Sequence, residues 1–232
     1  MDNTIEDTNE DNKNYIKEFT EGLRFILNHE LFSKTLIVFI GINFFGSFLA
    51  VLPEKMMINE LNFLPEQVGI VNAVAGTGIL IGGYMIGKRK NIKNPLAYMK
   101  FGFTLSILLI PLYILPIYLD MGSTVSVLYI ALLFFMYLFL NQISNVPFLS
   151  FIQIVVPHKI KGRFFAATQV VNMVLNPLGV ILFSLLYDLG YYWQVHLIVT
   201  VILLLLIFTM IRKTLLKKSE QLYIQALHKD EH

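Results

Sequence analysis

The chain has 232 residues, of which 56% are hydrophobic and 15% are charged, with a formal net charge of +2 and no cysteine. Soluble domains usually hold about 45–50% apolar and about 25% charged residues, so this composition favours a membrane protein in contact with a lipid bilayer. The small net charge argues against a nucleic-acid partner, and the lack of cysteine excludes disulfides, zinc–cysteine sites and thiol catalysis.

The first 33 residues divide into two predicted segments. Residues 1–14 are acidic and polar and lack the pattern of a secretory signal peptide, which predicts a disordered cytoplasmic tail. Residues 15–33 predict an amphipathic helix on the inner membrane surface, a structural lead-in to the first span rather than a lipid sensor. Its apolar residues stand at helical spacing: Ile16, Phe19, Leu23, Ile26, Leu27 and Leu31.

Six uncharged runs follow, each near the length of about 20 residues that crosses a hydrocarbon core of roughly 30 Å. Residues 34–212 are therefore predicted to form a bundle of six transmembrane helices. In the fourth run, Pro147 and Pro157 predict a span near 124–146 with a continuation toward Val156. The runs are 35–52, 68–87, 101–119, 121–157, 164–187 and 189–211.

The basic residues predict the orientation of these spans. If the N-terminus is cytoplasmic, every one of the 18 Lys and Arg residues except Lys55 lies on the inner side, as short cytoplasmic loops require. We therefore expect a multi-pass protein of the plasma membrane with both termini inside and a cytoplasmic tail over residues 213–232. The loop residues that anchor this topology, and that we expect near anionic headgroups, are Lys88, Arg89, Lys90, Lys159, Lys161 and Arg163.

Side-chain amides mark the first, second, fourth and fifth runs. The third run has none in its middle, and the sixth has only Gln194 and His196 near its outer end. This order predicts an inverted repeat of three plus three helices, an arrangement common in secondary transporters. The amides either line a solute cavity or join helices by hydrogen bonds. The cavity candidates are Asn43, Asn72, Asn141, Gln142, Asn145, Gln169, Asn172 and Asn176.

The stretch AGTGILIGGYMIGKRKNIKN (75–94) admits two interpretations, a phosphate-binding loop or the end of a membrane helix. A dinucleotide site requires a preceding strand, which the sequence does not predict. We therefore interpret Gly76, Gly83 and Gly87 as a packing seam within a membrane helix, with Gly78 and Gly82 as a second patch of close approach. Pro147 and Pro177 are predicted to supply local breaks at which the bundle flexes.

Other classes of function find less support. An aquaporin-like channel uses paired Asn-Pro motifs, but Asn94-Pro95 lies in a basic loop and no Arg follows Asn176-Pro177. Neither HExxH nor GxSxG occurs and the five His are scattered, so we expect no catalytic site, metal or cofactor. A fragment that inserts into the membrane but transports no solute is a further alternative. No Asp, Glu, Lys or Arg lies in the middle of a span, so a proton-carrying group is not expected on these helices.

Two segments resemble the major facilitator superfamily of transporters, in its C-terminal six-helix half. EFTEGLRFILNHELFSKTL (18–36) is similar to the segment before the seventh helix of macrolide-efflux-type and siderophore-exporter-type members. VPFLSFIQIVVPHKIKGRFFAATQVVNMVLNPLGVILFSLLYDLG (146–190) is similar to their tenth and eleventh helices, with the joining loop P-x-x-x-x-G-R. GYMIGKRK (83–90) resembles the loop signature of the family, with Gly87 where the family has an Asp.

The resemblance implies a transporter of twelve helices in two halves that exports amphipathic small molecules by alternating access, usually against protons. On this mapping the first, second, fourth and fifth spans line the cavity. The first six helices of the family have no counterpart here, so the expected partner is a separate N-terminal half or a second copy of this chain. A truncated, non-transporting fragment is the alternative. The missing Asp places the family's gating ion pair in doubt for this half.

Overall fold

The computed structural model of the chain describes residues 20, 24, 26–89 and 92–230. Over these residues the secondary structure is helical and contains no strand. Six segments are long and apolar enough to cross a membrane, the number predicted from the sequence. The predicted tail 1–14 and nine of the 19 residues of the predicted amphipathic helix 15–33 lie outside the described residues. The six spans are Glu30–Asn59, Pro65–Gly87, Pro95–Tyr118, Ser123–Val155, Ile160–Asp188 and Trp193–Met210.

Two of the six spans are built from several helical pieces, and the other four are single helices. The first span comprises α2 (Glu30–Gly46), the 3₁₀ helix η1 (Ser47–Ala50) and α3 (Leu52–Asn59). The third comprises α5 (Pro95–Leu109), the 3₁₀ helix η2 (Ile110–Ile114) and α6 (Leu115–Tyr118). The second, fourth, fifth and sixth spans are α4 (Pro65–Gly87), α7 (Ser123–Val155), α8 (His158–Asp188) and α9 (Tyr192–Met210).

Proline and amide side chains set the starts of α4 and α5. Pro65 and Pro95 occupy the first helical position, where the missing N–H leaves no bond unmade. Asn94 Oδ1 accepts a hydrogen bond from the backbone N–H of Ala97 at 3.1 Å. Gln67 Oε1 accepts one from the backbone N–H of Leu64 at 2.9 Å. These bonds satisfy amide groups that have no partner within the helix, and so they fix where each span begins.

The fourth and fifth spans pass through their internal prolines. α7 continues for 33 residues through Pro147, and α8 continues for 31 residues through Pro177. The expected continuation of the fourth run toward Val156 is present and belongs to the same helix as the span, because Pro147 removes only one backbone donor and the helix resumes on both sides. The use of either proline in flexing stays a prediction.

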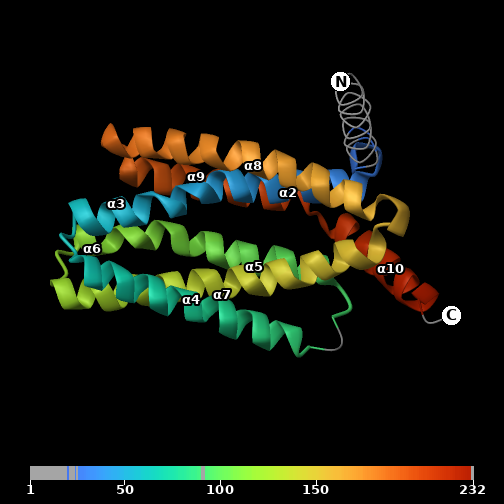
Figure 1. The fold of residues 1–232 in the computed structure, drawn as a ribbon, viewed down its shortest axis with the longest axis horizontal. Helices are drawn as coiled ribbons and strands as arrows, with labels where there is room; N and C mark the ends of the chain where they lie inside the picture. The colour runs from blue at the N-terminus through green and yellow to red at the C-terminus, as the bar shows by residue number, and fades with distance from the viewer. Residues whose placement is uncertain (1–19, 21–23, 25, 90–91, 231–232) are drawn as a thin grey trace, which may run out of the picture.

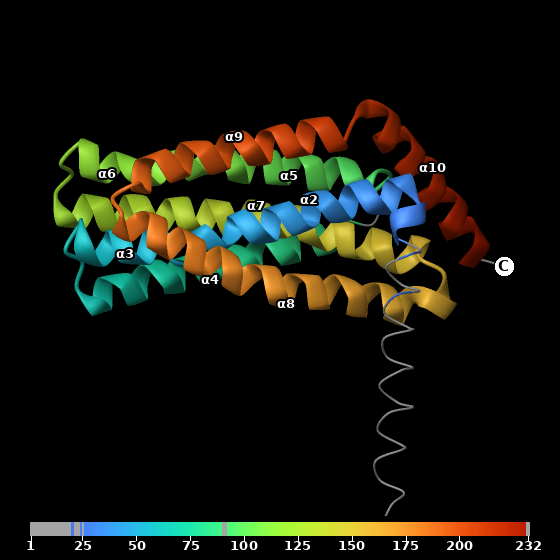
Figure 2. The same ribbon diagram turned by 90° about the horizontal axis from the view of Figure 1, so that it is seen from above.

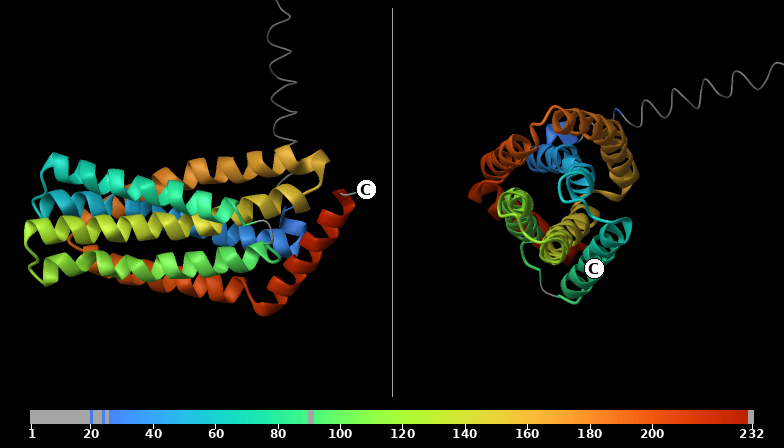
Figure 3. Two further views of the ribbon diagram at one scale, coloured as in Figure 1. Left: turned by 90° about the horizontal axis from the view of Figure 1, so that it is seen from below. Right: turned by 90° about the vertical axis from the view of Figure 1, so that its left-hand side faces the viewer.

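The spans form two groups that run along the long axis of the molecule (Figure 1). In one group α7 packs against α4 and α5, and in the other α2 packs against α8 and α9. Contacts of α9 with α5 and η2 join the groups. Seen end-on, α4 and α8 lie on one side of the bundle and α5 and α9 on the other (Figure 3, right). Two helices that are far apart in sequence thus flank one face.

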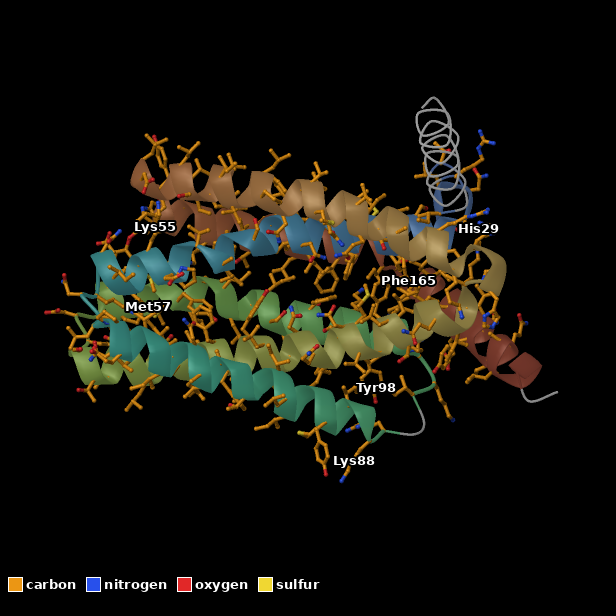
Figure 4. All side chains as sticks on the ribbon, in the orientation of Figure 1. His29, Lys55, Met57, Lys88, Tyr98 and Phe165 are labelled. Carbon is orange, nitrogen blue, oxygen red and sulfur yellow. The ribbon has the colours of Figure 1, made fainter. Side chains whose placement is uncertain are left out.

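Charge is divided between the two ends of the bundle. Figure 4 places Lys55 at one end and His29 and Lys88 at the other. The second end, where α4 ends and α5 begins, is called the basic end below. Of the Lys and Arg side chains that the structure describes, all except Lys55 belong to it: Arg24, Lys34, Lys88, Arg89, Lys93, Lys100, Lys161, Arg163, Arg212, Lys213, Lys217 and Lys218.

Large apolar side chains cover much of the outer surface between these ends. Leu80 of α4 is 73% exposed, Met173 of α8 is 68% exposed and Leu128 of α7 is 67% exposed. A soluble monomer rarely exposes apolar patches this extensive. The surface therefore suits lipid, as the composition predicts.

The C-terminal segment is a helix, where the sequence predicts only a cytoplasmic tail. α10 (Lys213–Asp230) crosses the basic end of the bundle and packs against α5, α7 and α2 (Figure 2). Leu215, Ser219 and Tyr223 face inward and are buried. Asn94 Nδ2, at the start of α5, donates to the carbonyl oxygen of Leu216 at 3.1 Å. α10 is therefore part of the packed molecule.

Of the two packing patches predicted on α4, the structure confirms the one at Gly78 and Gly82 and not the one at Gly76, Gly83 and Gly87. A Cβ on Gly78 would lie 2.5 Å from the carbonyl oxygen of Phe135, and one on Gly82 would lie 2.7 Å from that of Phe139. Gly76, Gly83 and Gly87 have nothing within 4 Å of a Cβ. The seam against α7 is therefore the second patch, because its glycines, spaced by four residues, face the backbone of α7.

Candidate functional site

Five of the predicted amides meet in one cavity of about 440 Å³ between α2, α7 and α8. Ala50 and Asn176 line it and are exposed, so this amide chamber opens at the surface of the bundle. The lining residues are Phe39, Ile42, Asn43, Gly46, Ser47, Ala50, Phe103, Tyr137, Asn141, Gln142, Asn145, Leu149 and Asn176.

Three of the five amides of the chamber form hydrogen bonds within their own helices. Asn145 Nδ2 donates to Asn141 Oδ1, one turn away on α7. Asn43 Nδ2 donates to the carbonyl oxygen of Phe39 at 2.8 Å on α2. Neither bond joins two helices, so these side chains are not used to hold the bundle together. Asn141 also forms a side-chain hydrogen bond with Tyr137, one turn earlier on the same helix.

Tyr137 lines the same chamber, although sequence reasoning did not select it. It stands one turn before Asn141 on α7, and a Cβ on Gly46 of α2 would lie 3.9 Å from Tyr137 Oη. Its hydroxyl thus reaches across the cavity to the opposite helix. The spacing 137, 141, 145 places all three side chains on one face of α7, and that signal could have identified it.

A second cavity of about 390 Å³ adjoins the first and is mainly aromatic and aliphatic. Phe39 and Leu149 line both cavities, so the two are neighbours. Gln169 and Asn172, predicted to share a cavity with the other amides, belong to this one. The lining residues of this aromatic chamber are Thr35, Leu36, Phe39, Phe148, Leu149, Ile152, Phe164, Phe165, Ala166, Thr168, Gln169 and Asn172.

Packed rings build the wall of the aromatic chamber. The ring centroids of Phe39 and Phe148 are 5.4 Å apart, and those of Phe164 and Phe165 are 5.9 Å apart in an edge-to-face arrangement. Phe165 extends from α8 toward the interior (Figure 4). Sequence reasoning missed these residues, because 19 Phe are spread over the chain and none of their spacings singles out these four.

Among the described side chains that line the aromatic chamber, one polar atom is fully buried and has no hydrogen-bond partner. It belongs to Asn172. Its Oδ1 is buried and accepts no hydrogen bond. Leaving a buried acceptor unpaired costs about 1–3 kcal/mol, because the group gives up its hydration without replacement. A donor from a solute or a water molecule would remove this cost.

Asn72 lies outside both chambers. Its side chain is exposed on α4, on the side of the helix that carries Gly76 and away from the seam with α7. The second span contributes no lining residue to either chamber, and the role of Asn72 in a solute cavity stays a prediction. The sequence places Asn72 in the correct helix, but not on the face that looks inward, because α4 turns its Gly78 and Gly82 side to α7.

The chambers offer hydrogen bonding and apolar contact without formal charge. None of the residues that line either one is Asp, Glu, Lys, Arg or His. The amides and Tyr137 can donate and accept hydrogen bonds, and the phenylalanines supply apolar surface. Such a lining suits reversible binding of an uncharged solute.

Neither models of protein families, nor curated proteins, nor solved structures give a match to this chain. The function is therefore inferred from the sequence and from the geometry of the two chambers.

Proposed function

We propose that this chain is one six-helix half of a membrane transporter of the major facilitator type. It exports an amphipathic small molecule by alternating access and works with a second six-helix unit, which is either a separate N-terminal half or another copy of the chain. Transport is coupled to protons. The observation that carries the proposal is the amide chamber, in which five separately predicted side chains from three spans meet.

The pattern of helix contacts supports an inverted repeat of three plus three. Such a repeat equates the first span with the fourth, the second with the fifth and the third with the sixth. Span four packs against spans two and three, and span one packs against spans five and six. The contact between spans three and six is its own counterpart, whereas the smaller contact between spans five and six has no equally extensive equivalent between spans two and three. Exchanging the two halves of the repeat thus preserves the main contacts between spans.

Glycines at equivalent contacts give a second line of support. Gly78 and Gly82 bring span two onto span four, and Gly179 brings span five onto span one, with its Cβ position 2.7 Å from the carbonyl oxygen of Phe44. Gly102 lies against Leu140 and Ser144 of span four, and Gly41 lies against Leu206 of span six. Each of the four contacts that the repeat relates in pairs therefore holds a glycine.

The face flanked by α4 and α8 is the surface on which a second unit would dock. Asn72, Gln169 and Asn176 are exposed on these two helices, and amides that face hydrocarbon are costly. Gly76 and Gly83 are uncovered on α4, where small residues allow a neighbouring helix to come close. A partner helix bundle would cover both features, whereas lipid would leave the amides unpaired.

Proton coupling would depend on the partner unit. The spans hold no Asp, Glu, Lys or Arg in their middles, and the chambers are lined by none. A titratable group at membrane depth is what a proton-coupled carrier needs. In a pair of unlike halves, we expect that group on the other half.

Flux measurements in inverted membrane vesicles from cells that express the full chain test the proposal. Uptake of radiolabelled chloramphenicol, an uncharged aromatic amide, is measured with and without an imposed pH gradient. We expect gradient-dependent uptake that falls by about tenfold or more in the triple variant N145A/N172A/N176A, because several solute hydrogen bonds are lost together. Gln153→Ala, which removes an exposed amide outside both chambers, serves as the control.

Three outcomes would contradict the proposal in different ways. Uptake that the triple variant leaves unchanged would make the amides structural. Flux that ignores the pH gradient and follows osmotic pressure would favour a channel. Uptake equal to that of vesicles without the chain would contradict transport by copies of this chain alone, as expected of a non-transporting fragment.

A further inference from the structure

The two chambers together form one elongated site with unlike ends. Phe39 and Leu149 are the side chains that line both. On one side of them lie the rings of α7 and α8, and on the other lie the amides of α2 and α7. The volumes of about 390 Å³ and about 440 Å³ each fall within the range of about 300–1,000 Å³ that is usual for small-molecule sites.

We propose that this joined site binds an uncharged amphipathic molecule in one orientation. Its ring system lies in the aromatic chamber, one N–H or O–H group donates to Asn172 Oδ1, and its polar end lies in the amide chamber. This ligand class deepens the proposed function and rests on it for the use of the site in transport.

The rings determine which end of the ligand enters the aromatic chamber. Phe39, Phe148, Phe164 and Phe165 surround it from three helices. Aromatic faces and edges pack well against a flat ring of the ligand and gain more than area burial alone. The amide chamber, in contrast, presents hydrogen-bonding groups that a ring would leave unpaired.

The buried Asn172 Oδ1 determines what the ligand must carry. Within the part of the chain that the structure describes, this hydrogen-bond acceptor has no partner, and Asn172 lines the chamber. A hydrocarbon chain from a lipid cannot donate to it. A ligand with an N–H or O–H beside its ring system can, and such a ligand is therefore preferred over a lipid tail.

The absence of charge among the lining residues excludes a strongly charged ligand. Lys34, next to Thr35 at the rim, is already paired with Glu30 at 2.7 Å. A sulfonate or carboxylate in the chambers would lose its hydration without a counter-ion in contact. Because Arg163 precedes Phe164 at the basic end, an anionic amphiphile is the competing ligand that the experiment has to separate.

Binding of three related dyes to the full chain in lipid nanodiscs tests the proposal. N-phenyl-1-naphthylamine is uncharged and carries one N–H. Its N-methyl derivative lacks the donor, and 1-anilinonaphthalene-8-sulfonate adds a negative charge to the same rings. Fluorescence titrations are corrected with empty nanodiscs. We expect saturable binding of the first dye, about threefold to tenfold weaker binding of the N-methyl form, and binding weaker by more than about a hundredfold for the sulfonate.

Matched variants locate the dye. Phe165→Ala should weaken binding of N-phenyl-1-naphthylamine by about tenfold, whereas Phe101→Ala, at an exposed ring of α5, should not. Asn172→Leu should abolish the difference between the N–H and N-methyl dyes, whereas Asn72→Leu should preserve it. If Phe165→Ala does not fold, as judged by circular dichroism and gel filtration, Leu149→Trp narrows the shared passage and should have the same effect.

The ligand class would be overturned by any of three results: no binding above that of empty nanodiscs, sulfonate binding as tight as that of the neutral dye, or an N–H preference that survives Asn172→Leu. Equal binding of the N–H and N-methyl dyes to the unmodified chain would favour a lipid-like occupant and contradict the proposal as well. Saturable dye binding without flux would support the binding site and contradict the proposed transport function. Flux without dye binding would support transport and contradict this ligand class.

Discussion

Adjacent glycines on α4 have opposite environments, although nothing in the local sequence separates them. The Cβ position of Gly82 lies 2.7 Å from the carbonyl oxygen of Phe139 and 3.2 Å from Cβ of Gln142. The Cβ position of Gly83, the next residue, meets nothing within 4 Å. A methyl group added at residue 82 would therefore lie in the seam between α4 and α7, whereas one added at residue 83 would lie on the uncovered face of α4.

We predict that Gly82→Ala lowers the stability of the bundle and that Gly83→Ala does not. The added methyl at residue 82 forces the backbones of α4 and α7 apart, an overpacking cost of about 1–3 kcal/mol. At residue 83 it meets no atom of the chain. Thermal unfolding in detergent, followed by circular dichroism, measures both variants. Equal midpoints for the two variants would contradict the packing of α4.

At the scale of elements, α10 connects the two groups of spans at the basic end. Asn94, at the start of α5, donates to Leu216 of α10, and Lys100 Nζ donates to the carbonyl oxygen of Ile211 at 2.7 Å. Lys218 of α10 lies 3.5 Å from a carboxylate oxygen of Glu30 on α2. α10 thus contacts both groups. The ion pair with Glu30 is exposed and contributes little, so burial of Ser219 and its neighbours dominates the docking.

Replacing Ser219 by Leu should detach α10 while the spans remain folded. Ser219 is fully buried and donates to the carbonyl oxygen of Leu216 at 2.8 Å, so a larger apolar side chain both clashes and removes a hydrogen bond. Hydrogen–deuterium exchange of residues 213–227 should rise by about tenfold or more. Lys217→Leu, on the exposed side of the same helix, is the control. Unchanged protection in Ser219→Leu would show that the helix docks by other contacts.

At the scale of the whole molecule, the described basic side chains other than Lys55 gather at one end, whereas Asp120 and Asp188 lie at the other. The basic end faces the cytoplasm if the bundle follows the rule that Lys and Arg stay inside. α10 and the aromatic chamber would then be near the inner leaflet. Export would begin from that side.

Single cysteines test this orientation, because the chain has none of its own. Asn59→Cys, at the end of α3, should react with a membrane-impermeant maleimide in intact cells. Lys93→Cys, between α4 and α5, should react only after the cells are permeabilised. Flux activity and expression matched to the unmodified chain serve as controls. The reverse pattern would invert the topology and with it the direction of export.

The sequence by itself determined the six spans, the division of charge and all five amides of the amide chamber. Uncharged runs of about 20 residues can bury their backbone groups in lipid only as helices, so length and hydropathy suffice to find them. The positions 141, 142 and 145 could be assigned to one face of a helix by period alone. Helical period does not state which face of a lipid-exposed helix turns inward, so it did not indicate that Asn72 lies outside both chambers.

Only the tertiary structure decided the rest. Whether a glycine of α4 contacts α7 depends on how the helix is rotated about its own axis. The sequence does not reveal this rotation, because lipid and the protein interior are both apolar and favour the same side chains. The aromatic chamber arises where rings from α2, α7 and α8 converge. Its lining residues lie as far as 137 positions apart in the chain, from Thr35 to Asn172, and no local pattern encodes that meeting. The docking of α10 likewise depends on Asn94, which is more than 100 residues away in sequence.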